Sequence, residues 1–402
     1  MISTNNNIMN YQLSKYIGDR NISEAVEKGI LKKGDNIILP YSNLHIFDIA
    51  EVCTDLIVND INTYIVLEDE YQILFKKLIL LGDKKIKQKE GIIKIITRTQ
   101  YLNGGYDYMK GKIKLSDGNP PYDGKSELHQ KIFNKTLELL EDGGQMTFIQ
   151  PSTPIHNKKE DKINKDGTKK PTLIMKENLC NYNTEIEVVS GSIFKDAAIA
   201  TDLMITTITK KQSNFYGIDK ITYKNGQVYT NVNIEDISMT QVPPNIYKNI
   251  LKKYKKLCLS NGTINDIAYF SKNMNSYDNY ISIAQVRGHI DTVTGGLKND
   301  FFTYFSKDNI TKDADDIKYG LLSDYKENTF KYLSSNVARF GLSLLKFNSN
   351  NHMGENKLTP LVDFSRTYTD QELYDMLGLT EEEIIEIEKV IPYWDHFGGN
   401  NG

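Results

Sequence analysis

The 402-residue sequence has few cysteines and no long apolar run, and each absence excludes a class of protein. Its three cysteines, Cys53, Cys180 and Cys258, are far apart and odd in number, which argues against a disulfide framework and against a CxxC metal site. No stretch of 18 or more apolar residues predicts a membrane span, and the N-terminus lacks the apolar core of a secretory signal. We therefore expect a protein of the reducing cytoplasm that has neither a membrane partner nor a metal.

The composition is ordinary for a soluble globular protein, with 25% charged and 39% hydrophobic residues. The chain is long enough for two domains, each with its own core. Its net charge of −3 neither indicates nor excludes a polyanionic partner, because local clusters of Lys and Arg decide that question.

Short apolar runs alternate with helical patterns over the first 210 residues. Strands are expected at 36–39, 55–58, 92–96, 113–115 and 145–149, and helices at 45–53, 64–81 and 127–141. This alternation is typical of βαβ units and a parallel sheet. Residues 192–209 resemble two strands with no helix between them, which fits an antiparallel pair at the edge of that sheet.

The texture of the sequence changes after about residue 215, where the segments become short and rich in Tyr, Thr, Asn and Gly. Helical periodicity returns at 326–345, and capped helix starts are expected near 370 and 380. We therefore place a domain boundary near residue 212, so that 1–212 is an α/β domain and 213–402 is a mixed domain with a helical tail.

One short corner carries the chemistry: Asn119, Pro120, Pro121 and Tyr122 follow the strand expected at 113–115. Two prolines exclude a helix or a central strand, and the carboxyl end of a parallel strand is where open α/β sheets bind ligands. The Asn119 amide oxygen and the Pro120 carbonyl can accept both hydrogens of one amine, while Tyr122 can stack on a planar ligand. A plain solvent turn is the alternative.

This corner resembles the fourth motif, (D/N/S)PP(Y/F), of the N6-adenine-specific DNA methyltransferases, in particular the NPPY type related to type IIG restriction–modification methylases. The segments 128–152, 192–211 and 361–384 are also similar to parts of that family. The resemblance implies a Rossmann-like sheet dependent on S-adenosylmethionine (SAM) in 1–212, the catalytic domain. It implies a C-terminal mixed α+β target-recognition domain, with a helical end, in 213–402.

In that family SAM binds at a glycine-rich turn after the first strand, and the corresponding stretch here is Leu39 to Phe47. Pro40 and Phe47 are in register with the family motif, whereas Asn43 and His45 stand where it has glycines. The resemblance also implies that Asp60, expected after the strand at 55–58, accepts the ribose hydroxyls; a helix cap is the alternative. The implied cofactor-binding residues are Pro40, Ser42, Asn43, Phe47, Asp60 and Ile61.

A duplex DNA partner requires phosphate contacts and base contacts. The cluster around Lys252, Lys253 and Lys255 and the lysine-rich loop 157–170 are candidates for the first, and the loop could equally be a solvated insertion. Arg287 and His289 are candidates for reading bases. The target adenine must flip out of the duplex to reach the corner.

The sequence thus predicts a site-specific DNA adenine-N6 methyltransferase that acts in the cytoplasm of a bacterial or phage-infected cell, with a restriction or companion subunit as a further partner. Two alternatives stay open. The same corner serves protein-glutamine N5-methyltransferases, although those generally carry their extra domain before the catalytic half. A catalytically silent homologue that binds DNA or a partner would also fit, because the turn 39–47 lacks the family's glycines.

Overall fold

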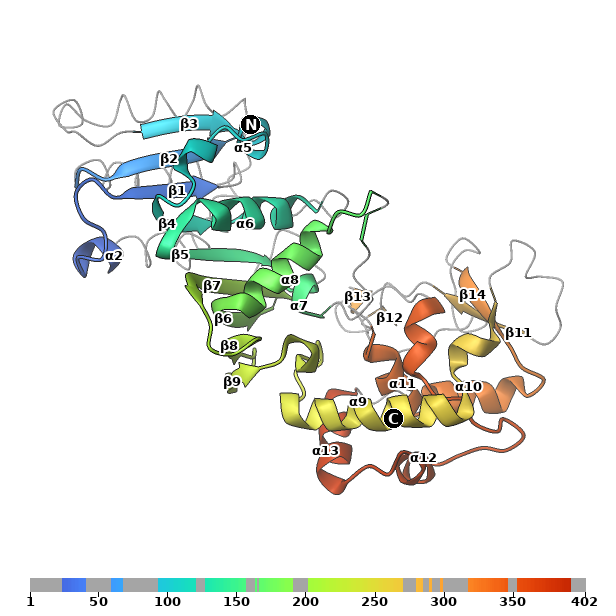
Figure 1. Ribbon diagram of the computed structural model, residues 1–402. Helices are drawn as coiled ribbons and strands as arrows, with labels where there is room; N and C mark the ends of the chain where they lie inside the picture. The colour runs from blue at the N-terminus through green and yellow to red at the C-terminus, as the bar shows by residue number, and fades with distance from the viewer. Residues whose placement is uncertain are drawn as a thin grey trace. The chain divides into compact units, whose positions relative to one another are not determined.

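The computed structural model describes residues 24–40, 59–67, 93–120, 127–156, 163–164, 166–190, 202–269, 280–284, 289–290, 297–298, 317–345 and 353–391 (Figure 1). The chain divides into two compact units. Unit 1 comprises Met1–Pro154 and Glu160–Ile234, and unit 2 comprises Ile155–Lys159 and Glu235–Gly402.

A nine-stranded sheet runs through unit 1 in the order β3-β2-β1-β4-β5-β7-β6-β8-β9. β7 is antiparallel to both β5 and β6, and β9 is antiparallel to β8; the other neighbouring pairs are parallel. The strands are β1 (Asn36–Pro40), β2 (Asn62–Leu67), β3 (Ile93–Thr97), β4 (Ile113–Gly118), β5 (Leu140–Pro151), β6 (Tyr182–Val189), β7 (Leu203–Gln212), β8 (Ile218–Thr222) and β9 (Val228–Val232). The predicted α/β fold with a Rossmann-like, mostly parallel sheet is confirmed.

Helices cover one face of this sheet, as Figure 1 shows for α5 (Arg98–Leu102), α6 (Leu128–Leu139) and α8 (Pro171–Asn181). The ring of Phe133 on α6 meets Phe148 on β5 edge to face, with centroids 5.9 Å apart. The hydroxyls of Tyr101 and Thr136 join α5 to α6 at 2.8 Å. Because the central strands are buried on both faces, β1 is a continuous apolar run rather than an alternating one.

The shorter elements of the first half are α2 (Glu24–Glu27), η4 (Asp107–Met109), α7 (Thr153–His156) and η6 (Ile234–Asp236). None of the helices in the described part of the chain combines the length and the apolarity that crossing a bilayer requires.

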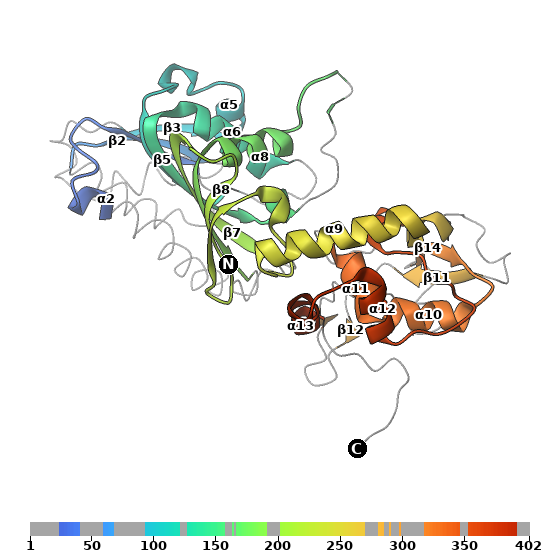
Figure 2. The ribbon, with the colours of Figure 1, turned by 60° about the horizontal axis from the view of Figure 1, so that its bottom comes forward.

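Unit 2 is a mixed α+β unit with a three-stranded sheet in the order β10-β14-β11 and a two-stranded ribbon, β12-β13. Its long helix α9 (Pro244–Asn261) lies against α12, α13 and η11 (Figure 2). Tyr254 of α9 is fully buried and donates its hydroxyl to the Val337 carbonyl at 2.8 Å. The remaining elements are η7 (Ile264–Ile267), β10 (Ala268–Tyr269), β11 (Tyr280–Ala284), β12 (His289–Ile290), β13 (Leu297–Lys298), β14 (Ile317–Leu322), α10 (Lys326–Ser334), α11 (Asn336–Ser343), η11 (Met353–Leu358), α12 (Asp370–Leu377) and α13 (Glu381–Val390).

Three expectations differ from the structure. The boundary expected at 212 lies at the end of β7, but β8 and β9 continue the same sheet, so unit 1 extends to Ile234. The helix expected at 64–81 is a strand over its first four residues, because the run N-T-Y-I-V-L is short and rich in β-branched side chains. The antiparallel strand β7 lies inside the sheet and not at its edge. The strand expected at 55–58 lies outside the described residues.

Candidate active site

The strand order of the sheet reverses at β1, which has β2 on one side and β4 on the other. In open α/β sheets the ligand crevice lies outside the carboxyl ends of the strands at this reversal. β1 ends at Pro40 and β4 ends at Gly118, and the two ends are in close contact. A Cβ atom on Gly118 would lie 3.2 Å from the Pro40 carbonyl oxygen and 2.9 Å from Cε1 of Phe148. The strand that leads to the corner is therefore packed tightly against β1.

The first half of the predicted corner follows β4 directly. Asn119 and Pro120 are both buried, and Asn119 is only 7% exposed. β4 pairs with β5 up to Gly118 opposite Phe148, so the corner begins where the parallel ladder stops. The structure thus places an amide and a proline carbonyl at the carboxyl edge of the sheet, beside the end of β1. Pro121 and Tyr122 lie outside the described residues, and the stacking role of Tyr122 stays a prediction.

Polar residues lead into the corner from inside the sheet. Ser116 and Asp117 of β4 are both buried, although a central strand of a parallel sheet is normally apolar. The sequence contains a sign of these polar residues, because the apolar run I-K-L is followed by S-D-G before Asn119. The strand expected from the sequence ends at Leu115, so these two residues were not among the predicted site residues.

The helix after the corner, α6, also begins with buried polar side chains, which the sequence analysis missed. His129 and Gln130 lie in its first turn, and both are buried. Burial lowers the pKa of His129 from 6.5 to about 4, so its imidazole is neutral at physiological pH. The Oε1 atom of Gln130 accepts no hydrogen bond from any of the described residues. Two polar residues at the start of an otherwise apolar helix face would have been the signal.

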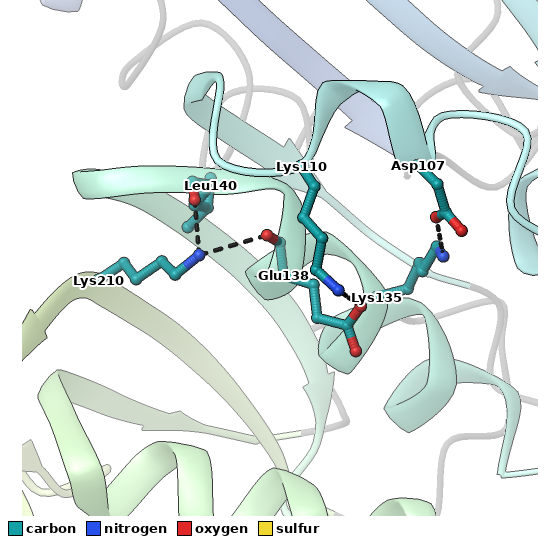
Figure 3. A network of polar contacts seen from close by, with 6 residues as sticks. All are labelled: Asp107, Lys110, Lys135, Glu138, Leu140 and Lys210. Carbon is teal, nitrogen blue, oxygen red and sulfur yellow. Dashed lines mark hydrogen bonds and ion pairs between the residues drawn. The ribbon is translucent and has the colours of Figure 1, made fainter.

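The far end of α6 is anchored by a polar network (Figure 3). Lys210 of β7 donates to the Leu140 carbonyl at 2.6 Å and to the Glu138 carbonyl at 3.3 Å, where the helix ends. An ammonium group is favourable at a helix C-terminus because it meets the unpaired carbonyls and the negative end of the helix dipole. The other two pairs of the network are Lys110 with Glu138, at 3.3 Å, and Lys135 with Asp107. These contacts fix the helix that follows the corner.

The cofactor residues implied by the resemblance fall in three places. Pro40 is the buried last residue of β1, at the edge where the crevice is expected. Ser42, Asn43 and Phe47 lie outside the described residues. Ile61 is a buried core residue next to the start of β2.

The ribose role predicted for Asp60 is corrected by the structure. Asp60 precedes β2 in a turn, with a left-handed φ of 59°, and its carbonyl accepts a hydrogen bond from Gly34 at 3.0 Å. Its carboxylate lies 3.5 Å from the Lys33 ammonium. Asp60 therefore lies at the amino edge of the sheet, opposite to the corner. The residue that follows β2 in the sequence is the acidic Glu68.

The residues predicted to contact DNA lie in different surroundings. Lys253 forms an ion pair with Glu383 inside unit 2, at 2.5 Å, so its ammonium group is engaged within the unit, and its role as a DNA contact stays a prediction. Lys252 and Lys255 are exposed on α9. His289 lies in β12, opposite Lys298 of β13, and Arg287 lies outside the described residues.

A separate polar hollow of about 420 Å³ lies on the β5-β7-β6-β8 part of the sheet. Its lining includes Gln145 in the middle of β5 and Thr209, which pairs with it, and none of its described lining residues belongs to β1, β4 or the corner. The hollow is therefore distinct from the candidate site. Over the described residues, His, Cys, Asp and Glu side chains form no group of three that could hold a metal ion.

No protein-family model and no curated protein matches this chain. Its structure is similar to that of a predicted O-methyltransferase from Agrobacterium tumefaciens, with 12% identity, 48% of this chain and 80% of that chain covered, and a TM-score of 0.29. It is similar to TrmN from Thermus thermophilus, with 12% identity, coverage of 47% and 48%, and a TM-score of 0.29. It is also similar to the 16S rRNA (adenine(1408)-N(1))-methyltransferase from Catenulisporales acidiphilia, with 10% identity, coverage of 48% and 95%, and a TM-score of 0.26.

Proposed function

We propose that this protein is a SAM-dependent methyltransferase that methylates N6 of an adenine flipped out of duplex DNA. One observation carries the proposal: the buried pair Asn119 and Pro120 lies at the carboxyl end of β4, next to the end of β1, where the strand order reverses. This is the place in an open α/β sheet where a cofactor and a substrate can meet.

The corner orients an amine. The Asn119 amide oxygen and the Pro120 carbonyl oxygen each accept one N–H of the adenine amino group, which leaves the nitrogen lone pair directed away from both. Because the corner is buried, these hydrogen bonds form with little competition from water. When bound, SAM supplies an electrophilic methyl group on a sulfonium. The amino nitrogen would form the new N–C bond as the bond between the methyl group and the sulfonium sulfur breaks, leaving a neutral thioether, and would then lose one proton to water, so the corner needs no nucleophilic side chain.

The cofactor fits the edge of the sheet that the corner shares. The adjacent strands β1 and β2 end at Pro40 and Leu67, and both of these residues are buried. The stretches that follow them in the sequence would hold SAM. After β1 these are Ser42, Asn43 and Phe47, as the resemblance implies. After β2 the first residue is Glu68, and a carboxylate at a strand end is suited to accept ribose hydroxyls. Tyr122 would stack on the adenine.

An adenine in duplex DNA as the target sets what the protein must do with its DNA partner. Adenine N6 cannot reach a buried corner while its base is stacked, so the enzyme must flip the nucleotide. Unit 2 would supply the phosphate contacts through Lys252 and Lys255, and Arg287 and His289 stay candidates for reading the sequence. A restriction or companion subunit is a further partner that the family resemblance allows.

The test is methyl transfer from labelled SAM to duplex DNA, followed by identification of the modified nucleoside. We expect N6-methyladenine, and we expect Asn119→Ala to lower the rate by at least about 100-fold because it removes one acceptor of a charge-developing amine. Asn214→Ala, an exposed asparagine of unit 1, is the matched control. Full activity of Asn119→Ala would disprove the role of the corner.

Two other outcomes would identify the competing functions. Label transferred to glutamine residues of a protein, and not to DNA, would indicate a protein-glutamine methyltransferase. No calorimetric binding at millimolar SAM would indicate a silent homologue.

A further inference from the structure

Helix α9 is unusually basic. Its 18 residues include five lysines and no aspartate or glutamate, within a chain whose net charge is −3. A basic helix of this kind cannot neutralise itself through pairs with acids one turn away, which is how most exposed helices balance their charge. The lysines are Lys248, Lys252, Lys253, Lys255 and Lys256.

The fold divides these lysines into two groups. The buried stripe of α9 runs through Ile246, Ile250 and Tyr254 at a spacing of four residues. Lys253 lies near this stripe and pairs with Glu383 at 2.5 Å. Lys248 is near the first turn and lies 3.7 Å from Asp236. Both are engaged within unit 2.

The other three lysines, Lys252, Lys255 and Lys256, form an exposed basic face on α9. None of them makes an ion pair with any residue in the described part of the chain. Lys252 stands three and four residues before the other two, so their ammonium groups share one side of the helix. Like charges at this spacing destabilise a helix by about 0.2–0.5 kcal/mol per pair, and an anionic ligand would relieve that repulsion.

We infer that this basic face binds the phosphate backbone of duplex DNA and supplies sequence-independent affinity. The inference rests on the proposed function, which brings duplex DNA to the protein. Lys252 and Lys256 are about 6 Å apart along the helix axis, a length over which the two strands of a DNA duplex together present at least about three phosphates, enough for one contact to each lysine. A membrane surface fits less well, because the apolar stripe of α9 is buried and of its apolar side chains only Leu259 is exposed, at 89%.

The test is the salt dependence of DNA binding. Fluorescence anisotropy with a labelled duplex gives Kd between 50 and 300 mM salt, for wild type and for the triple variant Lys252→Gln, Lys255→Gln, Lys256→Gln. Each phosphate contact contributes about 0.9 to the slope of log K against log salt, so the slope should fall by about 2.7. A duplex of unrelated sequence should show the same change. The single variants should each lower the slope by about 0.9.

The matched control is the double variant Lys326→Gln, Lys357→Gln, which removes two exposed lysines from α10 and η11 of the same unit. Its slope should equal that of wild type. An unchanged slope in the triple variant, an equal change in the control, or binding to vesicles of anionic lipid but not to DNA would each overturn the inference.

The result is separable from the proposed function. A reduced slope without any methyl transfer would support the basic face and reject the methyltransferase activity. Methyl transfer together with an unchanged slope in the triple variant would support the methyltransferase activity and reject the role of the basic face.

Discussion

The Nζ atom of Lys253 lies 2.5 Å from Oε2 of Glu383, and this ion pair joins the middle of α9 to the start of α13. Glu383 is buried, and the same oxygen also accepts the Thr380 backbone N–H at 2.7 Å in the capping box of α13. Lys253 therefore balances a buried carboxylate that the helix cap requires. Its function is structural, in contrast to the exposed lysines beside it.

We expect Lys253→Met to lower the free energy of unfolding by about 1–3 kcal/mol, because it leaves the Glu383 carboxylate buried without a counter-ion. Urea unfolding measures this. Lys252→Met, one residue away and exposed, should change stability by less than about 0.5 kcal/mol. If the two variants were equally stable, the ion pair would have no structural role. The slope of log K for DNA binding against log salt should instead change more in Lys252→Met than in Lys253→Met.

Gly118 tests how tightly the corner is held. A methyl group there would meet the Phe148 ring at 2.9 Å and the Pro40 carbonyl at 3.2 Å, so Gly118→Ala should destabilise the protein by about 1–3 kcal/mol. It should also lower methyl transfer, because it displaces Asn119. Gly354→Ala is the control, since a Cβ atom there meets nothing within 4 Å. Thermal unfolding of the two variants measures the difference. Equal melting temperatures for Gly118→Ala and Gly354→Ala would contradict the close contact of β1 with β4.

The buried His129 should make the free energy of unfolding depend on pH. Its pKa is lowered by burial to about 4 in the folded protein, so below pH 6.5 the unfolded chain binds a proton that the folded chain does not. Its contribution to stability is therefore complete above pH 6.5 and is lost as the pH falls to about 4, by up to about 3 kcal/mol. Unfolding of wild type and His129→Gln should be measured by urea at pH 7 and pH 5. A difference between them that does not change with pH would disprove the shift.

The sequence predicted those parts of the fold that depend on local pattern. The runs that became β1, β3 and β4 are short and apolar, and the capping boxes at Thr369 and Thr380 lie where the helix starts were expected. Asn119 follows the end of β4, as expected, because the two prolines after it in the sequence leave few structures to choose from. These features need no information from distant parts of the chain.

The remaining features depend on tertiary contacts. N-T-Y-I-V-L could be a strand or the start of a helix, and only its pairing between β1 and β3 decides. Because no strand was expected at 62–67, the ribose role was assigned to Asp60, which precedes that strand. Likewise, four adjacent lysine positions look equivalent in the sequence, and only the ion pair with Glu383 separates Lys253 from its neighbours.

The corrected position of β2 gives a direct comparison between two acids. Leu67 ends β2 at the edge of the sheet where SAM is proposed to bind, and Glu68 is the next residue in the sequence, whereas Asp60 precedes the strand. Removing a carboxylate that accepts ribose hydroxyls should weaken binding by roughly 10- to 100-fold. We expect this loss for Glu68→Ala in calorimetric titrations with SAM, whereas Asp60→Ala should bind SAM as wild type does. Asp60→Ala should instead lose stability, because alanine adopts the left-handed φ of 59° at a greater cost than aspartate. Weaker SAM binding in Asp60→Ala than in Glu68→Ala would restore the role first predicted for Asp60 and reject the crevice at the end of β2.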